Sequence, residues 1–421
     1  MTTKKNKENS DFKKYKKLFE NEKNTRISKQ VLWENYPNLV DKDKLFYTVE
    51  DKKLIKELLY NPLPAKYRSE YWYISTGAKL ECKNNPGYYQ KLVNLIPNFN
   101  DHPDFPIIEV DKERAFPEID FFQVNDNLKK LTNILKAFTI RNSPSIGYIQ
   151  AFSFIAAQLL YIFKEEEDNE EKAFWCFTKI IEDYLPFNYY IEVKGILDDF
   201  DIMYSFLKEK FNGLSKSQNT YINLNAIIPG CFSSLYADRI NLETLYNIWD
   251  VFFIYGDVIL FKAFYFYASF FIDKNFGFSI NQFPEKAKDI KQNDLLNYYL
   301  LMDKTLNDDY IKEHRSKVKK IEVEKNENID DNDKKCDKKN PYCLYIVRNK
   351  KINLFSEYKI FKLKENTKKN EDYFSELFKN DEFVNNNSKV IKNENHGGSL
   401  DDILIERVKH VCPQENQDVK K

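Results

Sequence analysis

The chain has 421 residues, 42% of them apolar and 16% aromatic, so it can build one large domain or two ordinary ones around a sizeable core. Its 10 glycines and 14 prolines are few for an all-β chain, which needs many tight turns. Basic and acidic residues both number 65, and this zero formal net charge gives no electrostatic argument for a nucleic-acid partner.

The N-terminal segment, residues 1–42, is rich in Lys, Asn and Glu and has weak hydrophobic periodicity, which predicts a flexible charged arm. Its charges are not followed by an apolar stretch, so we expect no secretory signal. Thr2 does not fit a myristoylation signal, and the final residues, QDVKK, do not form a prenylation box.

The middle of the chain, from Leu45 to about Asn307, carries aromatic and aliphatic residues at helical spacing, and we place one helical domain over residues 43–313. No run of alternating strands recurs. The pattern favours an all-α fold, with helices piled around an aromatic core. The helices predicted in this way cover residues 127–137, 148–163, 170–184, 191–206, 242–254 and 258–271.

Residues 251–272 are apolar enough to be mistaken for a membrane span. This stretch contains Gly256, Asp257 and Lys262, and its uninterrupted apolar runs are shorter than the roughly 18 residues that a span requires. A protein anchored in the membrane by this segment is one alternative. We favour a buried helical hairpin and expect no transmembrane segment.

The C-terminal tail, residues 314–421, is rich in Lys, Asn, Asp and Glu and is predicted to be largely disordered, with low-complexity stretches. Short apolar runs within residues 342–363 could form strands or pack on the domain. Ser399 to Asp402 could open a capped helix with one apolar face. Such a short helix is either marginal or a partner-binding segment, and we favour the former.

The sequence lacks the motifs on which several kinds of binding and catalysis depend. The chain has no GxxxxGK[ST] loop, no GxSxG turn and no HExxH pair, so neither P-loop nucleotide binding nor these catalytic motifs are expected. It has four histidines, and its six cysteines include no CxxC pair, so we expect free thiols in a reducing compartment and no metal site.

Two polar sites stand out against this background. Asp111 and Arg114 are three residues apart, so in a helical turn the carboxylate can hold the guanidinium at a fixed angle. Tyr148 and Gln150 are two apart and lie on opposite faces of a helix, so the Gln150 amide can project from the start of an apolar helix. The carboxylates at Asp198-Asp199 and in residues 165–168 are interpreted as solvated faces.

Five short blocks follow one another between residues 62 and 275. The first begins at Pro62, carries Arg68 and Trp72, and ends in Gly-Ala. In this order the five blocks resemble the TBC domain family of Rab GTPase-activating proteins. The other four are Ile108-x-x-Asp111-x-x-Arg114, Gly147-Tyr148-Ile-Gln150, Glu171-Lys-Ala-Phe174-Trp175, and Ile248-Trp249-Asp250 with Gly256.

The resemblance implies that Arg114 is an arginine finger and Gln150 a glutamine finger, supplied in trans to a GTP-bound Rab-family small GTPase. It further implies that Asp111 positions Arg114 and that Tyr148 braces the glutamine segment. In this interpretation the chain is not a hydrolase and binds no cofactor, because the partner carries GTP and Mg²⁺. The family motifs imply a framework of Arg68, Trp72, Gly147, Trp175, Trp249, Asp250 and Gly256.

The sequence departs from the family pattern at four places. Ala115 replaces a usual Thr, Ala151 a usual Gly and Asn247 a common basic residue, and no Trp stands near residues 228–232. These departures leave a second interpretation open, a Rab-binding scaffold on the same fold with weak or no catalytic activity. Either interpretation implies a cytoplasmic protein in vesicle trafficking, held peripherally at endomembranes through the Rab.

Overall fold

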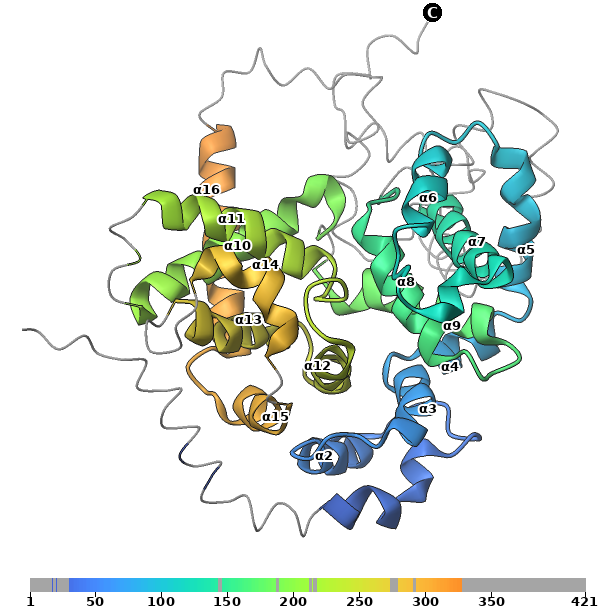
Figure 1. Ribbon diagram of the computed structural model, residues 1–421, viewed down its shortest axis with the longest axis horizontal. Coiled ribbons are helices and arrows are strands. Elements are labelled where there is room, and N and C mark those ends of the chain that lie inside the picture. The colour runs from blue at the N-terminus through green and yellow to red at the C-terminus, as the bar shows by residue number, and fades with distance from the viewer. Residues whose placement is uncertain are drawn as a thin grey trace, which may run out of the picture. The chain divides into compact units, whose positions relative to one another are not determined.

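The computed structural model describes residues 30–142, 146–186, 189–211, 218–272, 279–290 and 293–327, together with positions 17, 20 and 214 (Figure 1). Every regular element within these ranges is a helix, so the all-α prediction is confirmed. The strands and capped helix predicted in the tail, and most of the N-terminal arm, lie outside the described residues.

In the described part of the chain, sixteen helical elements precede residue 242. The α-helices up to the second predicted finger are α2 (Val49–Leu58), α3 (Ala65–Ser75), α4 (Ala78–Asn84), α5 (Tyr88–Leu95), α6 (Phe105–Lys112), α7 (Asn125–Asn142) and α8 (Ala151–Ile162). They are followed by α9 (Asn169–Lys179), α10 (Lys194–Lys210) and α11 (Gln218–Ser233). Short 3₁₀ helices are η1 (Gln30–Asn35), η2 (Pro37–Val40), η3 (Ile96–Phe99), η4 (Asp120–Gln123) and η6 (Ile191–Val193), and η5 (Ile180–Tyr184) is a π-helical turn.

The remaining elements are α12 (Leu242–Tyr255), α13 (Val258–Phe271), η9 (Ile280–Gln282), α14 (Phe283–Lys286), η10 (Ala287–Asp289), α15 (Asn293–Met302) and α16 (Asp308–Glu327). The predicted helix 258–271 coincides with α13. The predicted helix 148–163 begins only at Ala151, after Gly147 with its positive φ of 65°. Residues 170–184 form α9 and then widen into η5.

The chain divides into two compact units. The first contains Met1–Asn84, Ile108–Ile134 and Ile149–Val323. The second contains Asn85–Ile107, Leu135–Tyr148 and Glu324–Lys421. Three of the five divisions fall inside helices, namely α6, α7 and α16, and both predicted finger residues belong to the first unit.

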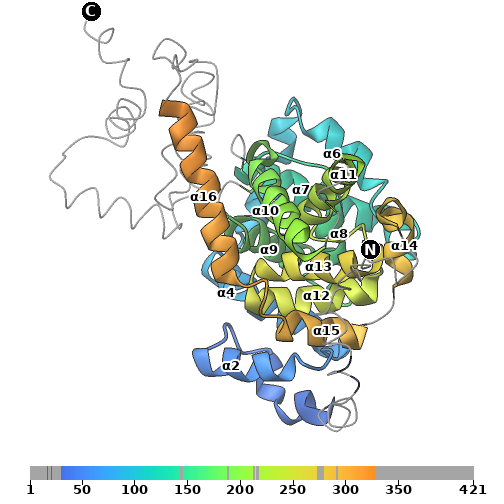
Figure 2. The same cartoon turned by 90° about the vertical axis from the view of Figure 1, so that its left-hand side faces the viewer.

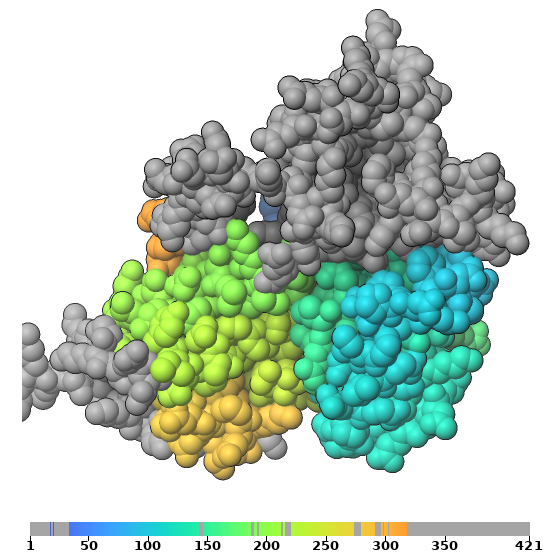
Figure 3. All heavy atoms as spheres, turned by 90° about the horizontal axis from the view of Figure 1, so that it is seen from above, coloured from blue at the N-terminus to red at the C-terminus, as the bar shows by residue number. Residues whose placement is uncertain are grey.

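The apolar stretch 251–272 is a buried helical hairpin, as predicted. Helices α12 and α13 pack against each other and both contact α15 (Figure 2). All residues of α13 are buried. A helix that is apolar all round belongs in a core. The green to yellow part of the chain, which holds α10, α11 and α13, forms one continuous mass of atoms (Figure 3). Among the described residues, no helix is long and apolar enough to cross a membrane.

Lys262 is the one cation inside α13, and its position explains why it is tolerated there. Its Nζ donates to the carbonyls of Leu300 at 3.0 Å and Asp303 at 2.7 Å. Carbonyls at a helix C-terminus have no partner within the helix, so the ammonium satisfies the end of α15. Burial lowers the pKa of Lys262, and the Asp303 carboxylate opposes this shift.

Asp199 is not on a solvated face, and that prediction is wrong. It is 1% exposed and accepts two hydrogen bonds from Arg315 of α16, from Nε at 2.8 Å and from Nη2 at 2.6 Å. The same guanidinium donates to Asp257 at 2.6 Å, in the turn between α12 and α13. Sequence spacing could not show this, because the cation stands 116 residues away. Most of residues 165–168 are exposed, as expected.

Residues just outside the predicted boundaries of the helical domain, 43 and 313, are also packed against it. Trp33 in η1 is 1% exposed and meets the Tyr71 ring of α3 edge-on, so this part of the segment predicted as a flexible arm is packed. At the other end, α16 continues across residue 313, and Arg315 lies beyond that position. Burial of an aromatic ring and of an ion pair holds these two segments on the first unit.

Candidate functional site

The framework of the site is a polar cluster buried between α3 and α12. The Asp250 carboxylate accepts from Arg68 Nε at 3.1 Å and Nη2 at 2.9 Å, and from Trp72 Nε1 at 2.7 Å. Arg68 Nη2 also donates to the Leu63 carbonyl, and the Tyr71 hydroxyl donates to the Asp250 carbonyl. Burial raises the pKa of Asp250, and the Arg68 charge opposes that rise. Residues that belong to the first and last sequence blocks therefore form one cluster.

Aromatic packing surrounds this cluster. The Trp72 ring lies within 5.5 Å of the rings of Tyr246, Trp249 and Phe253, measured between centroids. Trp249 Nε1 donates to the Leu235 carbonyl at 2.9 Å, and Trp175 is buried in α9. A fully buried indole is stable where its N–H finds an acceptor. The Trp72 and Trp249 indoles both meet this condition, through the Asp250 carboxylate and the Leu235 carbonyl.

Arg114 lies in the turn that follows α6, and its exposure sets it apart. Its side chain is 63% exposed, whereas that of Asp111 is 5% exposed. One guanidinium nitrogen lies 3.5 Å from the Asp111 carboxylate, and the Arg114 amide donates to the Asp111 carbonyl at 3.0 Å. Among the described arginines it is the exposed one, since the remaining four, Arg68, Arg141, Arg239 and Arg315, are buried or half-buried. The arrangement presents a permanently charged guanidinium to solvent, with the Asp111 carboxylate beside it.

Gln150 begins α8, and its side chain is exposed, as predicted. It is the N-cap residue, and its side chain makes no capping hydrogen bond. Its carbonyl accepts from the amide of Ser153 at 3.1 Å and from the Ser153 hydroxyl at 2.8 Å, so the backbone is fixed while the amide group stays available. The rest of α8 is mostly buried, which anchors this end of the helix.

Ring packing joins the Arg114 turn to α8. The Phe116 ring meets the Phe154 ring edge-on, with 5.7 Å between the ring centroids. Phe154 is four residues after Gln150, and residues four apart share one face of a helix. Gln150, the N-cap residue of α8, therefore stands one helical turn before the ring that the Arg114 loop contacts. The structure brings the two predicted fingers to one region of the first unit.

Gly147 and Tyr148 belong to the second unit, where Asp104 holds them. The Tyr148 amide donates to Asp104 Oδ2 at 3.0 Å. Gly147 has φ of 65°, and a Cβ there would come within 3.2 Å of the same oxygen, so glycine suits both the conformation and the space. The Tyr148 side chain is half-buried, which fits its predicted bracing role. Sequence reasoning missed Asp104, because no spacing rule links it to Tyr148.

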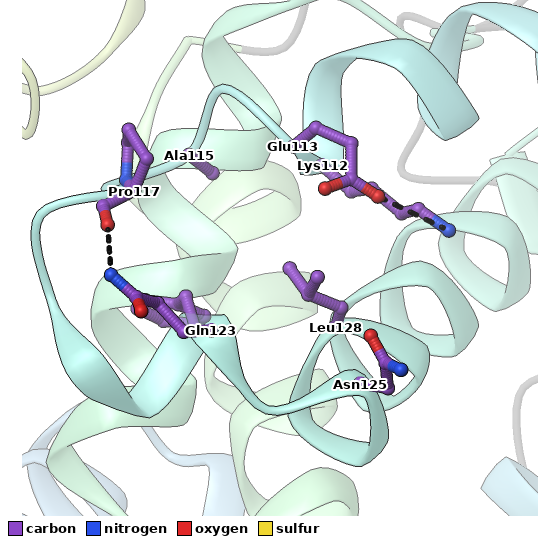
Figure 4. Close-up of a pocket in the computed structure, with 8 residues that line it drawn as sticks. Lys112, Glu113, Ala115, Pro117, Gln123, Asn125 and Leu128 are labelled. Atoms are coloured by element: carbon purple, nitrogen blue, oxygen red, sulfur yellow. Dashed lines mark hydrogen bonds and ion pairs between the residues drawn. The ribbon is translucent and has the colours of Figure 1, made fainter.

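A pocket of about 270 Å³ lies beside the Arg114 turn (Figure 4). Ala115, Phe122 and Leu128 line it with apolar atoms, while Gln123 Nε2 donates to the Pro117 carbonyl at 3.1 Å at its rim. Ala115 is buried, so the methyl that replaces a hydroxyl-bearing side chain is part of the pocket wall. Ala151 is half-buried at the first position of α8.

A family profile and several curated relatives match this chain. A profile of the Rab-GTPase-TBC domain matches residues 65–275, half of the chain. The chain belongs to the Rab-GTPase-TBC domain family. All five sequence blocks overlap this TBC match, and so do both predicted fingers.

Curated relatives match the TBC region. Growth hormone-regulated TBC protein 1 of Xenopus tropicalis is 28% identical over 223 residues, which are 51% of this chain and 62% of that protein. TBC1 domain family member 2B of Homo sapiens is 29% identical over 247 residues, which are 57% of this chain and 24% of that protein. The chain thus spans less than two thirds of the length of these relatives.

Two solved structures share the TBC fold. The TBC domain of a Chlamydomonas flagellar RabGAP superposes with a TM-score of 0.51 at 20% identity, covering 70% of this chain and 97% of that one. The Ypt/Rab-GAP domain of Gyp1p also gives 0.51 at 20% identity, with 63% and 94% covered.

Proposed function

We propose that this protein is a GTPase-activating protein for Rab-family small GTPases and supplies two catalytic side chains in trans. The observation that carries the proposal is the pairing of an exposed Arg114, steadied by buried Asp111, with an exposed Gln150 on a helix packed against the same loop. The solved relatives are named as Rab GTPase-activating domains, which supports the choice of partner.

In the proposed mechanism the Rab carries GTP and Mg²⁺, and this chain binds no cofactor of its own. Arg114 contributes a planar, permanently charged fork that stabilises the charge developing on the transferred phosphoryl group. The Gln150 amide holds the attacking water in line, and Asp111 keeps the guanidinium in place. Arginine fingers of this kind accelerate hydrolysis by about 10³–10⁵. Binding to a Rab would place the protein at the cytosolic face of endomembranes.

The test is single-turnover GTP hydrolysis by a panel of purified Rab proteins. We expect wild type to accelerate at least one Rab, and Arg114→Ala to remove about 10³-fold of that acceleration. Arg114→Lys should lose nearly as much, because an ammonium group cannot form the two-pronged contact. Gln150→Ala should lose about 10²-fold. The matched control is Gln90→Ala, an exposed glutamine of α5, which should keep wild-type activity.

A second function is favoured by the alanines beside both fingers. Ala115 forms part of the pocket wall next to Arg114, and Ala151 adds a methyl group directly after Gln150. If wild type binds a GTP-loaded Rab without accelerating hydrolysis anywhere in the panel, the protein is a Rab-binding scaffold. The substitutions Ala115→Thr and Ala151→Gly then test whether these two positions suppress catalysis.

A further inference from the structure

Phe116, two residues after Arg114, has a backbone conformation that is unfavourable for its type. Its φ is 57°, in the left-handed region that bulky side chains rarely adopt because Cβ crowds the following carbonyl. Such conformations persist only where surrounding contacts hold them, and they concentrate at functional sites. The Arg114 loop therefore needs a source of constraint.

Ring packing supplies that constraint. The Phe116 side chain is 6% exposed. Its ring meets the Phe154 ring of α8 at 79° with 5.7 Å between centroids, and the Phe122 ring of η4 at 6.4 Å. The Phe116 carbonyl also accepts from the Ile119 amide at 3.0 Å, which closes the turn. Edge-to-face ring pairs add to the stabilisation that burial gives.

The contact with Phe154 links two groups that must act together. Phe154 lies four residues, about one helical turn, after the N-cap residue Gln150, and Phe116 lies two residues after Arg114. A change in the Phe116–Phe154 contact would move the Arg114 loop relative to the start of α8. Displacement of a catalytic group by about 1 Å can cost about 10²-fold in rate.

We propose that Phe116 is a positioning residue, whose ring, held between Phe122 and Phe154, fixes the Arg114 loop against α8, the helix that Gln150 precedes as its N-cap residue. This proposal rests on the proposed GTPase-activating function. Phe116 does not touch the partner or its nucleotide in this scheme. It acts through Arg114, by restricting where the guanidinium can lie.

Phe116→Gly removes the ring but lets the backbone of the turn keep its conformation, because glycine adopts a φ near 57° without strain. We expect this variant to lower the kcat of Rab-stimulated hydrolysis by about 10- to 100-fold, while KM for the Rab changes less than about threefold. In an Arg114→Ala background, Phe116→Gly should cause no further loss, since groups that act as a unit are not additive. An unchanged kcat, a loss confined to KM, or an additive loss would overturn the proposal.

Hydrogen exchange gives a measurement that does not depend on activity. The amides of Arg114 and Ala115 donate to the carbonyls of Asp111 and Lys112. In Phe116→Gly these amides should exchange faster, while amides of α13 keep their wild-type rates. If no Rab is accelerated by wild type, the proposed function fails, yet this comparison still decides whether Phe116 holds the loop. Unchanged exchange at Arg114 and Ala115 overturns the proposal.

Two further variants complete the design. Phe154→Leu keeps an apolar side chain in α8 but removes the ring that Phe116 meets, so it should also lower kcat and speed amide exchange at Arg114 and Ala115. It replaces Phe116→Gly as the test if that variant speeds exchange in α13 as well. Tyr221→Ala is the control, because it removes another edge-to-face ring partner, that of Tyr204, from an exposed position of α11. It should leave kcat and loop exchange unchanged. Wild-type behaviour of Phe154→Leu contradicts the proposal.

Discussion

At the scale of single residues, the two arginines of the sequence blocks show how environment decides what one side chain does. Arg68 is surrounded by acceptors and faces a carboxylate whose side chain is 1% exposed, so its charge is paired within the fold. One guanidinium nitrogen of Arg114 lies 3.5 Å from the Asp111 carboxylate, and most of the Arg114 side chain is exposed to solvent. A buried ion pair contributes specificity of packing, whereas an exposed and oriented one can be offered to a partner.

The Arg68–Asp250 pair yields a prediction for stability. Asp250→Ala leaves the Arg68 charge buried with no carboxylate, which should lower the free energy of unfolding by about 3–5 kcal/mol. The double variant Arg68→Met with Asp250→Ala should recover part of that loss, because no unpaired charge remains. Urea unfolding of the wild type, of Asp250→Ala and of the double variant measures both effects. A double variant that is less stable than Asp250→Ala would contradict this account.

At the scale of elements, α16 is joined to α10 and to the α12–α13 turn by one arginine shared between two carboxylates. Arg315 pairs with Asp199 and Asp257, and its guanidinium also lies 5.7 Å from the centre of the Phe261 ring. Because two carboxylates share one cation, the three side chains carry one net negative charge when both carboxylates are ionised. Burial is the first cause that raises the pKa of Asp199 to about 6; Asp257 adds to the rise and Arg315 opposes it.

This shift predicts how stability depends on pH. Asp199 has a pKa near 3.8 when unfolded and about 6 when folded, so between these values the folded state holds a proton that the unfolded chain has released. Its contribution to the free energy of unfolding is therefore largest at low pH and declines as pH rises through this window. The free energy of unfolding of the wild type minus that of Asp199→Asn, measured by chemical unfolding, should fall by about 3 kcal/mol from pH 4 to pH 7. A difference that rises with pH would show that the carboxylate is stabilised as an anion.

At the scale of the whole molecule, the first unit is assembled from segments far apart in the sequence. It takes in η1 near one end and the start of α16 at the other, with the aromatic hairpin α12–α13 buried between its neighbours. At its C-terminal side Arg315, which stands just beyond residue 313, pairs with Asp199 and Asp257. The helical body therefore includes residues that composition alone assigns to the tail.

A truncation series tests this. A chain ended after residue 313 leaves Asp199 and Asp257 without Arg315, so it should lose about 3–5 kcal/mol of stability relative to a chain ended after residue 327. Thermal or urea unfolding of the two fragments measures the difference. Full-length Arg315→Met is the matched variant and should lose a similar amount. Equal stability of both fragments would show that α16 contributes little.

Much of the fold and part of the site could be predicted from the sequence. Helical spacing gave α12 and α13 almost residue by residue, because a buried helix must place apolar side chains on all faces and Gly256 marks the turn between them. The spacing of Asp111 and Arg114 is short enough for a helical turn to fix their contact. Exposure of Gln150 followed from its place at the start of an apolar helix.

Contacts between residues distant in the sequence were decided only by tertiary structure. No local pattern pairs Arg68 with Asp250 over 182 positions, or Arg315 with Asp199 over 116. Asp199 was misjudged for this reason, since a carboxylate beside another carboxylate resembles a solvated face until its distant partner is known. The left-handed Phe116 and its ring contact with Phe154 likewise depend on how the loop meets α8. Sequence periodicity determines which face of an element is buried, and packing in three dimensions decides what that face meets.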